Sequence, residues 1–261
     1  MCYHVKKLSD TEEKTLAVKA LLILLLIPAA FIAVTLAFLL LMAVSTLFVD
    51  PNKLYNELSP YYRFLADGTD LIFMIYSRIC IHLSGQEKLP GDGKYLLVSN
   101  HRSGYDPLCT MHALRKEKLV FISKPENFTI PFIGRLARVN CFRPIDRENA
   151  RNALVTIKDC AELLKKGVAP VVVYPEGTRS RTGELQPFHN SVFKIAQEAN
   201  VPIVVMTAKG TENIKANLPW HKTDVTLTIL DVLPADHVKA ERTAKLGEEI
   251  REIMERNLKE S

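Results

Sequence analysis

The sequence lacks the short motifs that would indicate several common kinds of site. It contains no GxxxxGK phosphate-binding loop and no HExxH pair of the kind that binds zinc. Its positive charge is accompanied by no basic helix, zinc finger or aromatic platform, so nucleic acid is not an expected partner. These absences leave nucleotide-dependent, zinc-dependent and nucleic-acid-binding functions without support.

Cysteine is also scarce, with five residues and no CxxC pair. An odd number without paired spacing is typical of a reducing compartment, and it favours neither a disulfide framework nor a zinc site. The five are Cys2, Cys80, Cys109, Cys141 and Cys160.

Charge is missing altogether from Ala20 to Val49. This run exceeds the roughly 18 apolar residues that suggest a membrane segment, and it is too long for the apolar part of a signal peptide, about 7–15 residues. No polar stripe interrupts it, as a helix of a soluble core would require. Lysines precede this run, which favours the cytoplasmic side of the membrane for the residues before it. The sequence therefore predicts a membrane protein, at the cytoplasmic face of the inner or plasma membrane.

A second partly apolar stretch, Lys53 to Leu83, follows a break at Asp50-Pro51. It is too short and too charged for a clear crossing. We expect the two stretches to form a membrane-embedded hairpin of two helices. A single true crossing, with the remaining chain on the far side, stays open. The predicted domains are residues 1–83, the membrane segment, and 84–261, a globular domain.

The net charge of +5 belongs entirely to the second domain. Residues 1–83 carry seven basic and seven acidic side chains, whereas residues 84–261 carry 27 and 22. A basic domain next to a membrane suits anionic lipids and anionic substrates.

Short apolar segments alternate with amphipathic ones after residue 94, which predicts an α/β fold with a mixed β-sheet flanked by helices. The expected strands are Tyr95–Ser99, Leu119–Ser123, Cys141–Ile145, Pro170–Tyr174, Ile203–Ala208 and Val225–Leu230. The expected helices are Pro107–Leu114, Arg147–Lys166, Ser191–Ala199 and Val238–Leu258.

The clearest candidate for catalysis is the segment from Ser99 to Asp106, at the end of the first of these strands. A histidine and an aspartate five residues apart across a tight turn can meet. The carboxylate would then fix one imidazole tautomer and stabilise the imidazolium, which makes His101 a general base for a hydroxyl group. A helix-capping aspartate beside an unrelated surface histidine would give the same spacing.

Two further segments suggest anion binding. The run Glu176-Gly177-Thr178-Arg179 follows a strand and combines backbone freedom, donors and a guanidinium. Lys124 and Arg147 each end a predicted strand and bracket the most arginine-rich stretch. An ordinary turn and a solvated basic face are the alternatives.

Together these segments resemble, in the same order, the motifs of the lysophosphatidic acid and glycerol-3-phosphate acyltransferase family. Asn100-His101 to Asp106 resembles its NHxxxxD motif. Gly134 to Arg147 resembles its second block, whose end, here Phe142 to Arg147, usually reads closer to F-I-D-R. Tyr174 to Ser180 resembles its PEGTRS block, with tyrosine where phenylalanine is common. Val201 to Val204 resembles its fourth block, and Gly210-Thr211 the turn after it.

The resemblance implies a function and a site. His101 would be the general base and Asp106 its partner. Glu176, Gly177, Thr178 and Arg179 would hold the glycerol phosphate, helped by the two basic residues Lys124 and Arg147. The fourth block would line the acyl chains. The family takes its acyl group directly from acyl-CoA or acyl carrier protein, as co-substrate, and needs no metal or prosthetic cofactor.

Three functions stay open at this point. The first is acylation of 1-acylglycerol-3-phosphate at its free sn-2 hydroxyl, giving phosphatidic acid. The second is the same transfer to another acceptor, such as glycerol-3-phosphate, another lysophospholipid or a lyso-aminolipid. The third is a non-catalytic membrane protein that binds lipid, although binding alone would need neither His101 nor Asp106.

Overall fold

The computed structural model of the chain describes residues 2–146, 149–180 and 183–259. It divides into two compact units, one that ends at Ser45 and one that begins at Thr46. The predicted boundary lay at residue 83, where membrane association was expected to end.

The first unit is formed by α1 (Cys2–Leu47), which continues through Pro28. Within it, Thr15–Leu47 has a mean hydropathy of 2.8 and, among the described residues, is the one helix long and apolar enough to cross a membrane. From Leu21 to Ile27 its side chains are exposed. Exposed apolar surface of this extent is costly in water, as expected for a segment whose solvent is lipid.

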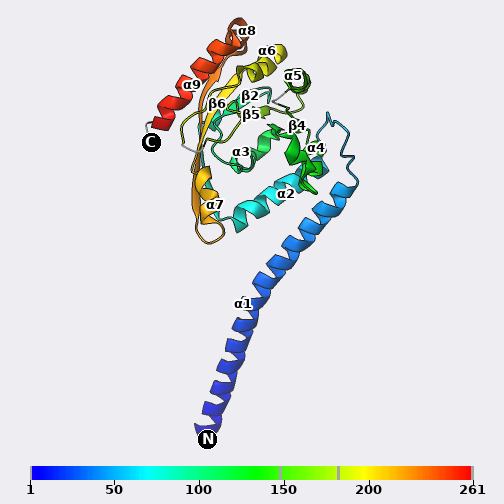
Figure 1. The fold of residues 1–261 in the computed structure, drawn as a ribbon. Helices are drawn as coiled ribbons and strands as arrows, with labels where there is room; N and C mark the ends of the chain where they lie inside the picture. The colour runs from blue at the N-terminus through cyan, green and yellow to red at the C-terminus, as the bar shows by residue number, and fades with distance from the viewer. Residues whose placement is uncertain (1, 147–148, 181–182, 260–261) are drawn as a thin grey trace. The chain divides into compact units, whose positions relative to one another are not determined.

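The second unit is built on a seven-stranded sheet with the order β1-β7-β6-β2-β5-β3-β4 (Figure 1). The five strands from β6 to β4 run parallel to one another, and β7 is antiparallel to β6 and parallel to β1. The sheet is therefore mixed, and the predicted α/β class is confirmed. The strands are β1 (Ile79–Ser84), β2 (Leu96–Ser99), β3 (Val120–Ser123), β4 (Arg143–Pro144), β5 (Val171–Val173), β6 (Ile203–Lys209) and β7 (Thr223–Leu233).

Helices cover both faces of the sheet (Figure 1). The central strands are apolar except toward their carboxyl ends, as expected for strands buried on two sides. Alternate residues supply the two faces: Leu96 and Val98 pack with α5, α6 and α9, whereas Leu97 packs with α2, α3 and α7. The helices are α2 (Pro60–Tyr76), α3 (Asp106–Ala113), α4 (Ile133–Val139), α5 (Ala150–Lys165), α6 (Lys194–Ala199), α7 (Ile214–Asn217), α8 (Ala235–Ala240) and α9 (Thr243–Lys259).

The predicted strands are all present, but one strand was missed. Ile79–Ser84 was read as the end of the second membrane helix, whereas it forms β1, at the edge of the sheet. The helix before it stops at Tyr76, and Arg78 adopts a left-handed conformation, with φ of 53°, that turns the chain into the strand. The last predicted helix is also interrupted, since α8 and α9 are separate.

The helix α2 belongs to the second unit, where Leu65 and Met74 are buried. It therefore packs as part of the globular domain. Its membrane contact, and the hairpin that it would form with α1, stay predictions.

Candidate active site

The candidate catalytic loop leaves the carboxyl end of β2 and enters α3. Asn100, just after the strand, is buried and fixes the loop to the neighbouring strand β6: its amide donates to the Ala208 carbonyl over 3.0 Å and accepts from the Ala208 amide over 2.7 Å. Pro107 then stands at the start of α3, where its missing N–H costs nothing. The six residues between Asn100 and Pro107 are thereby held in a tight turn.

His101 and Asp106 meet across this turn. The distance from His101 Nδ1 to Asp106 Oδ2 is 2.7 Å, the Asp106 side chain is fully buried, and the His101 side chain is 16% exposed. An ionised carboxylate only accepts hydrogen bonds, so Nδ1 carries a proton. In the neutral imidazole the lone pair is then on Nε2, which is the atom that could accept a proton.

The Asp106 carboxylate accepts three more hydrogen bonds. The amides of Arg102 and Ser103 donate to Oδ2, each over 2.8 Å, and the Thr211 hydroxyl donates to Oδ1. Four donors around one buried carboxylate stabilise its charge and leave it a single orientation. The carboxylate in turn fixes the imidazole.

Thr211 is a site residue that sequence reasoning did not identify. It follows β6, 105 residues after Asp106, and is brought in because β6 and β2 are neighbours. Gly210 makes its position possible: its φ is 88°, and a Cβ there would lie 2.3 Å from the Asp224 carbonyl oxygen. Gly210-Thr211 at a strand end was the signal present in the sequence.

Tyr174 packs against the face of the His101 imidazole. Its ring stacks on His101 with centroids 4.6 Å apart and an interplanar angle of 26°. The residue is buried at the end of β5, next to β2, and burial raises the pKa of its hydroxyl well above the ordinary value. Tyr174 therefore acts here as an uncharged aromatic surface.

Glu176 lies in the loop after β5 and is turned toward the protein. Its Oε1 accepts from the His101 amide over 2.7 Å and its Oε2 from the Gln186 amide over 2.8 Å. Burial raises the pKa of this carboxyl, and the two amides oppose that rise. The Ser180 amide donates to the His101 carbonyl, so the two loops are joined on both sides of His101.

The other residues predicted to bind phosphate either lie at the same edge of the sheet as His101 or fall outside the described residues. Arg179 and Thr178 are exposed, and the Arg179 guanidinium passes over Gly104, where an added Cβ would meet it at 3.5 Å. Gly177 has a φ of 68°, which suits glycine. Lys124 is exposed at the end of β3. Arg147 lies outside the described residues.

Two sequence expectations do not match the positions found. Val201 to Val204 leads into the amino end of β6, the edge opposite to His101, and is mostly buried in the core, so it does not line a site at His101. Arg143 belongs to the arginine-rich stretch, for which anion binding and a solvated basic face were the alternatives; it fits neither, because it is 1% exposed and donates to Asn56 and the Cys141 carbonyl.

An apolar cavity of about 340 Å³ adjoins the site. Tyr174 and Gly177 line it on one side, and Leu154 and Ile157 of α5 on another. It opens beside the residues that hold His101, at the carboxyl ends of the parallel strands.

Among the described residues, one group has metal-binding side chains close together: Cys80, His82 and Asp224, on β1 and β7. The Lys222 ammonium lies 2.8 Å from Asp224 and already pairs with it. This group lies on the edge strand β1 and its neighbour β7, which β6 separates from the strand β2 that leads into the His101 loop. The expectation that the protein needs no metal or prosthetic group remains a prediction.

The family model described as Acyltransferase matches residues 80–209, which contain both the His101 loop and the Glu176 loop. The 1-acyl-sn-glycerol-3-phosphate acyltransferase of Escherichia coli is 32% identical over 171 residues, 64% of this chain and 68% of that protein. The chain belongs to the acyltransferase family.

Plant and structural relatives agree with the assignment to the acyltransferases. A chloroplastic 1-acyl-sn-glycerol-3-phosphate acyltransferase of Brassica napus is 40% identical over 141 residues, 54% of this chain. The match spans only 40% of that longer protein. The crystal structure of the 1-acyl-sn-glycerophosphate acyltransferase of Thermotoga maritima has the same fold, with a TM-score of 0.60 at 21% identity over 78% of this chain and 83% of that one.

Proposed function

We propose that the protein transfers a fatty acyl group from acyl-CoA or acyl carrier protein to the sn-2 hydroxyl of 1-acylglycerol-3-phosphate, giving phosphatidic acid. The observation that carries the proposal is the His101–Asp106 hydrogen bond of 2.7 Å, which leaves Nε2 free to accept a proton. The family membership, and the acceptor in the names of the E. coli and plant relatives, support this choice of substrate.

In the proposed reaction, the lipid hydroxyl attacks the thioester carbonyl carbon while Nε2 of His101 takes its proton. The new C–O bond gives a tetrahedral oxyanion, and the imidazolium is stabilised by the buried Asp106 carboxylate. The intermediate collapses by breaking the C–S bond, and the imidazolium returns the proton to the departing sulfur. The products are the acylated lipid and a free thiol, and the enzyme regains its starting charge.

The phosphate of the acceptor is proposed to lie against Thr178 and Arg179. The Arg179 guanidinium already lies over Gly104 in the His101 loop, and a guanidinium matches phosphate oxygens. Lys124, at the end of β3, is proposed to add positive charge, and so is Arg147, which lies outside the described residues. Glu176 is better suited to positioning, because both its oxygens are used by backbone amides and its charge would repel phosphate. The apolar cavity beside Tyr174 is the proposed place for an acyl chain.

The proposal is tested by the product formed. Membranes containing the protein should convert labelled acyl-CoA or acyl carrier protein, with 1-acylglycerol-3-phosphate, to phosphatidic acid identified by mass. Other lysophospholipids and glycerol-3-phosphate should be acylated more slowly. A higher rate with an acceptor lacking phosphate would contradict the assigned acceptor, and no transfer to any of them would contradict the assigned activity.

Replacement of Arg179 by alanine should raise KM for 1-acylglycerol-3-phosphate about 10- to 100-fold and leave KM for the acyl donor unchanged. A hydrogen bond to a charged partner contributes about 1.5–3 kcal/mol, and each tenfold in affinity corresponds to about 1.4 kcal/mol. Both KM values are measured from steady-state rates in which one substrate is varied at a time. The matched control is Arg256→Ala, which removes the same charge from the exposed surface of α9. Equal effects of both changes would remove Arg179 from the proposed site.

A further inference from the structure

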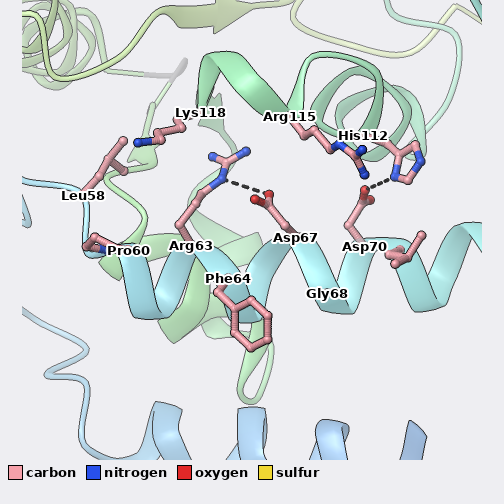
Figure 2. Close-up of a pocket in the computed structure, with 11 residues that line it drawn as sticks. Leu58, Pro60, Arg63, Phe64, Asp67, Gly68, Asp70, His112, Arg115 and Lys118 are labelled. Atoms are coloured by element: carbon pink, nitrogen blue, oxygen red, sulfur yellow. Dashed lines mark hydrogen bonds and ion pairs between the residues drawn. The ribbon is translucent and has the colours of Figure 1, made fainter.

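A cavity of about 420 Å³ lies between α2 and the segment that joins α3 to β3. Figure 2 shows Arg63, Asp67 and Asp70 projecting from α2 toward His112, Arg115 and Lys118 on the other wall. The Arg63 Nε pairs with Asp67 over 2.9 Å, and His112 Nδ1 lies 3.0 Å from Asp70 Oδ2. The cavity is thus lined by charged groups of both signs, with the basic ones in excess.

Two buried atoms of this cavity have no partner. Arg63 is 5% exposed and Asp70 2% exposed as side chains, yet Arg63 Nη2 and Asp70 Oδ1 make no hydrogen bond. An unsatisfied buried donor or acceptor is costly, more so when it is charged. A ligand that accepts from Arg63 and donates to Asp70 would remove both costs.

This cavity is separate from the His101 site. Arg63 Nη1 donates over 3.1 Å to the carbonyl of Leu119, which directly precedes β3, and Lys118 stands one residue earlier. The cavity therefore lies at the amino end of β3, whereas Lys124 follows its carboxyl end. Because β3, β5 and β2 are parallel, the cavity and the His101 loop lie at opposite edges of the sheet.

A second side of α2 carries an apolar stripe, and Phe64 and Leu71 in this stripe also line the cavity. Tyr61, Phe64, Leu71 and Ile75 are spaced by three, seven and four residues, so they share one side of the helix, and all four are exposed. Figure 2 shows Phe64 on the side opposite to Arg63 and Asp70. An exposed apolar stripe with charged side chains behind it suits a helix that lies in a membrane interface.

From the unpartnered atoms, the basic wall and the apolar stripe together, we propose that this cavity binds the head group of an anionic glycerophospholipid. The phosphate lies against Arg115, Lys118 and Arg63 Nη2, and a head-group hydroxyl donates to Asp70 Oδ1. Arg115 and Lys118 are exposed, and neither is joined by a hydrogen bond or ion pair to another residue drawn in Figure 2. The lipid is bound as a ligand at this site and is not the substrate acylated at His101.

The test is binding of dihexanoyl phosphatidylglycerol, a soluble anionic lipid with head-group hydroxyls, to the full chain in a non-ionic detergent, by calorimetry. The double variant Arg115→Gln/Lys118→Gln should bind it at least about tenfold more weakly, because two charge-assisted contacts are lost. Both residues are exposed, so the fold should persist. The charge-matched control, Lys116→Gln/Lys239→Gln, also removes two exposed positive charges, one from the same turn. It should bind as the unchanged protein does.

Three outcomes would overturn the proposal. Equal weakening in the control would mean that only general surface charge attracts the lipid. Equal binding of dihexanoyl phosphatidylcholine would exclude an anionic head group with a hydroxyl donor, and equal binding of inorganic phosphate would exclude a lipid. The variant Arg179→Ala should bind phosphatidylglycerol normally. If Arg179→Ala weakened lipid binding and the double variant did not, the lipid would bind at the His101 site and not in this cavity.

Discussion

Replacement of His101 by alanine should lower the rate of acyl transfer about a thousandfold while the protein stays in the membrane. A positioned general base contributes roughly 10²–10⁴ to the rate, and no other described imidazole is held by Asp106 to replace His101. The Asp106 carboxylate would keep the amides of Arg102 and Ser103 and the Thr211 hydroxyl, so the loop should persist. The measurement is kcat with saturating donor and acceptor, alongside the fraction of protein recovered with membranes.

The matched control is His82→Ala. His82 Nε2 also pairs with an aspartate, Asp224, at 2.9 Å, but both side chains are more than half exposed and lie at the edge of the sheet formed by β1 and β7. Its loss should leave kcat unchanged, because a histidine–aspartate pair without a substrate beside it performs no chemistry. A His101→Ala protein with near-normal kcat would show that another group removes the proton.

Much of the central architecture could be predicted because its signals are local. The strands β2, β5 and β6 are short and mainly apolar runs bounded by loop residues, and their burial on both faces explains why polar residues occur only toward their carboxyl ends. The meeting of His101 and Asp106 is local as well, since the two residues are five apart, between the end of β2 at Ser99 and the start of α3 at Asp106. The edge strand β1 lacks this signal because it is only partly buried and follows a helix directly.

Features that depend on distant parts of the chain could not be predicted. Thr211 reaches Asp106 only because β6 lies beside β2, and the orientation of Glu176 depends on the amides of His101 and Gln186. Arg143 is buried because Asn56, 87 residues earlier, accepts its hydrogen bond. A sequence indicates which side chains can bind an anion, whereas the fold decides which of them are already engaged by the protein.

Replacement of Asp106 by asparagine should reduce kcat by about 10²- to 10⁴-fold while the protein remains folded. The side chain has a definite way to fit: its carbonyl oxygen can take the place of Oδ2, facing the amides of Arg102 and Ser103, and its NH₂ group then faces Thr211. The Thr211 hydroxyl can accept as well as donate, so this contact survives by reversal. What is lost is the negative charge that stabilises the imidazolium.

The companion variant Asp106→Asn/Thr211→Val separates charge from geometry. Valine cannot accept from the asparagine NH₂, so the double variant should unfold more readily than Asp106→Asn alone, by about 1–3 kcal/mol for a buried donor left unsatisfied. Its kcat should fall little further, because the charge is already absent. Denaturant unfolding and steady-state kinetics measure the two effects independently. If Asp106→Asn retained most of kcat, the carboxylate would serve only to hold the turn between β2 and α3, and the charge-stabilised imidazolium would have to be abandoned.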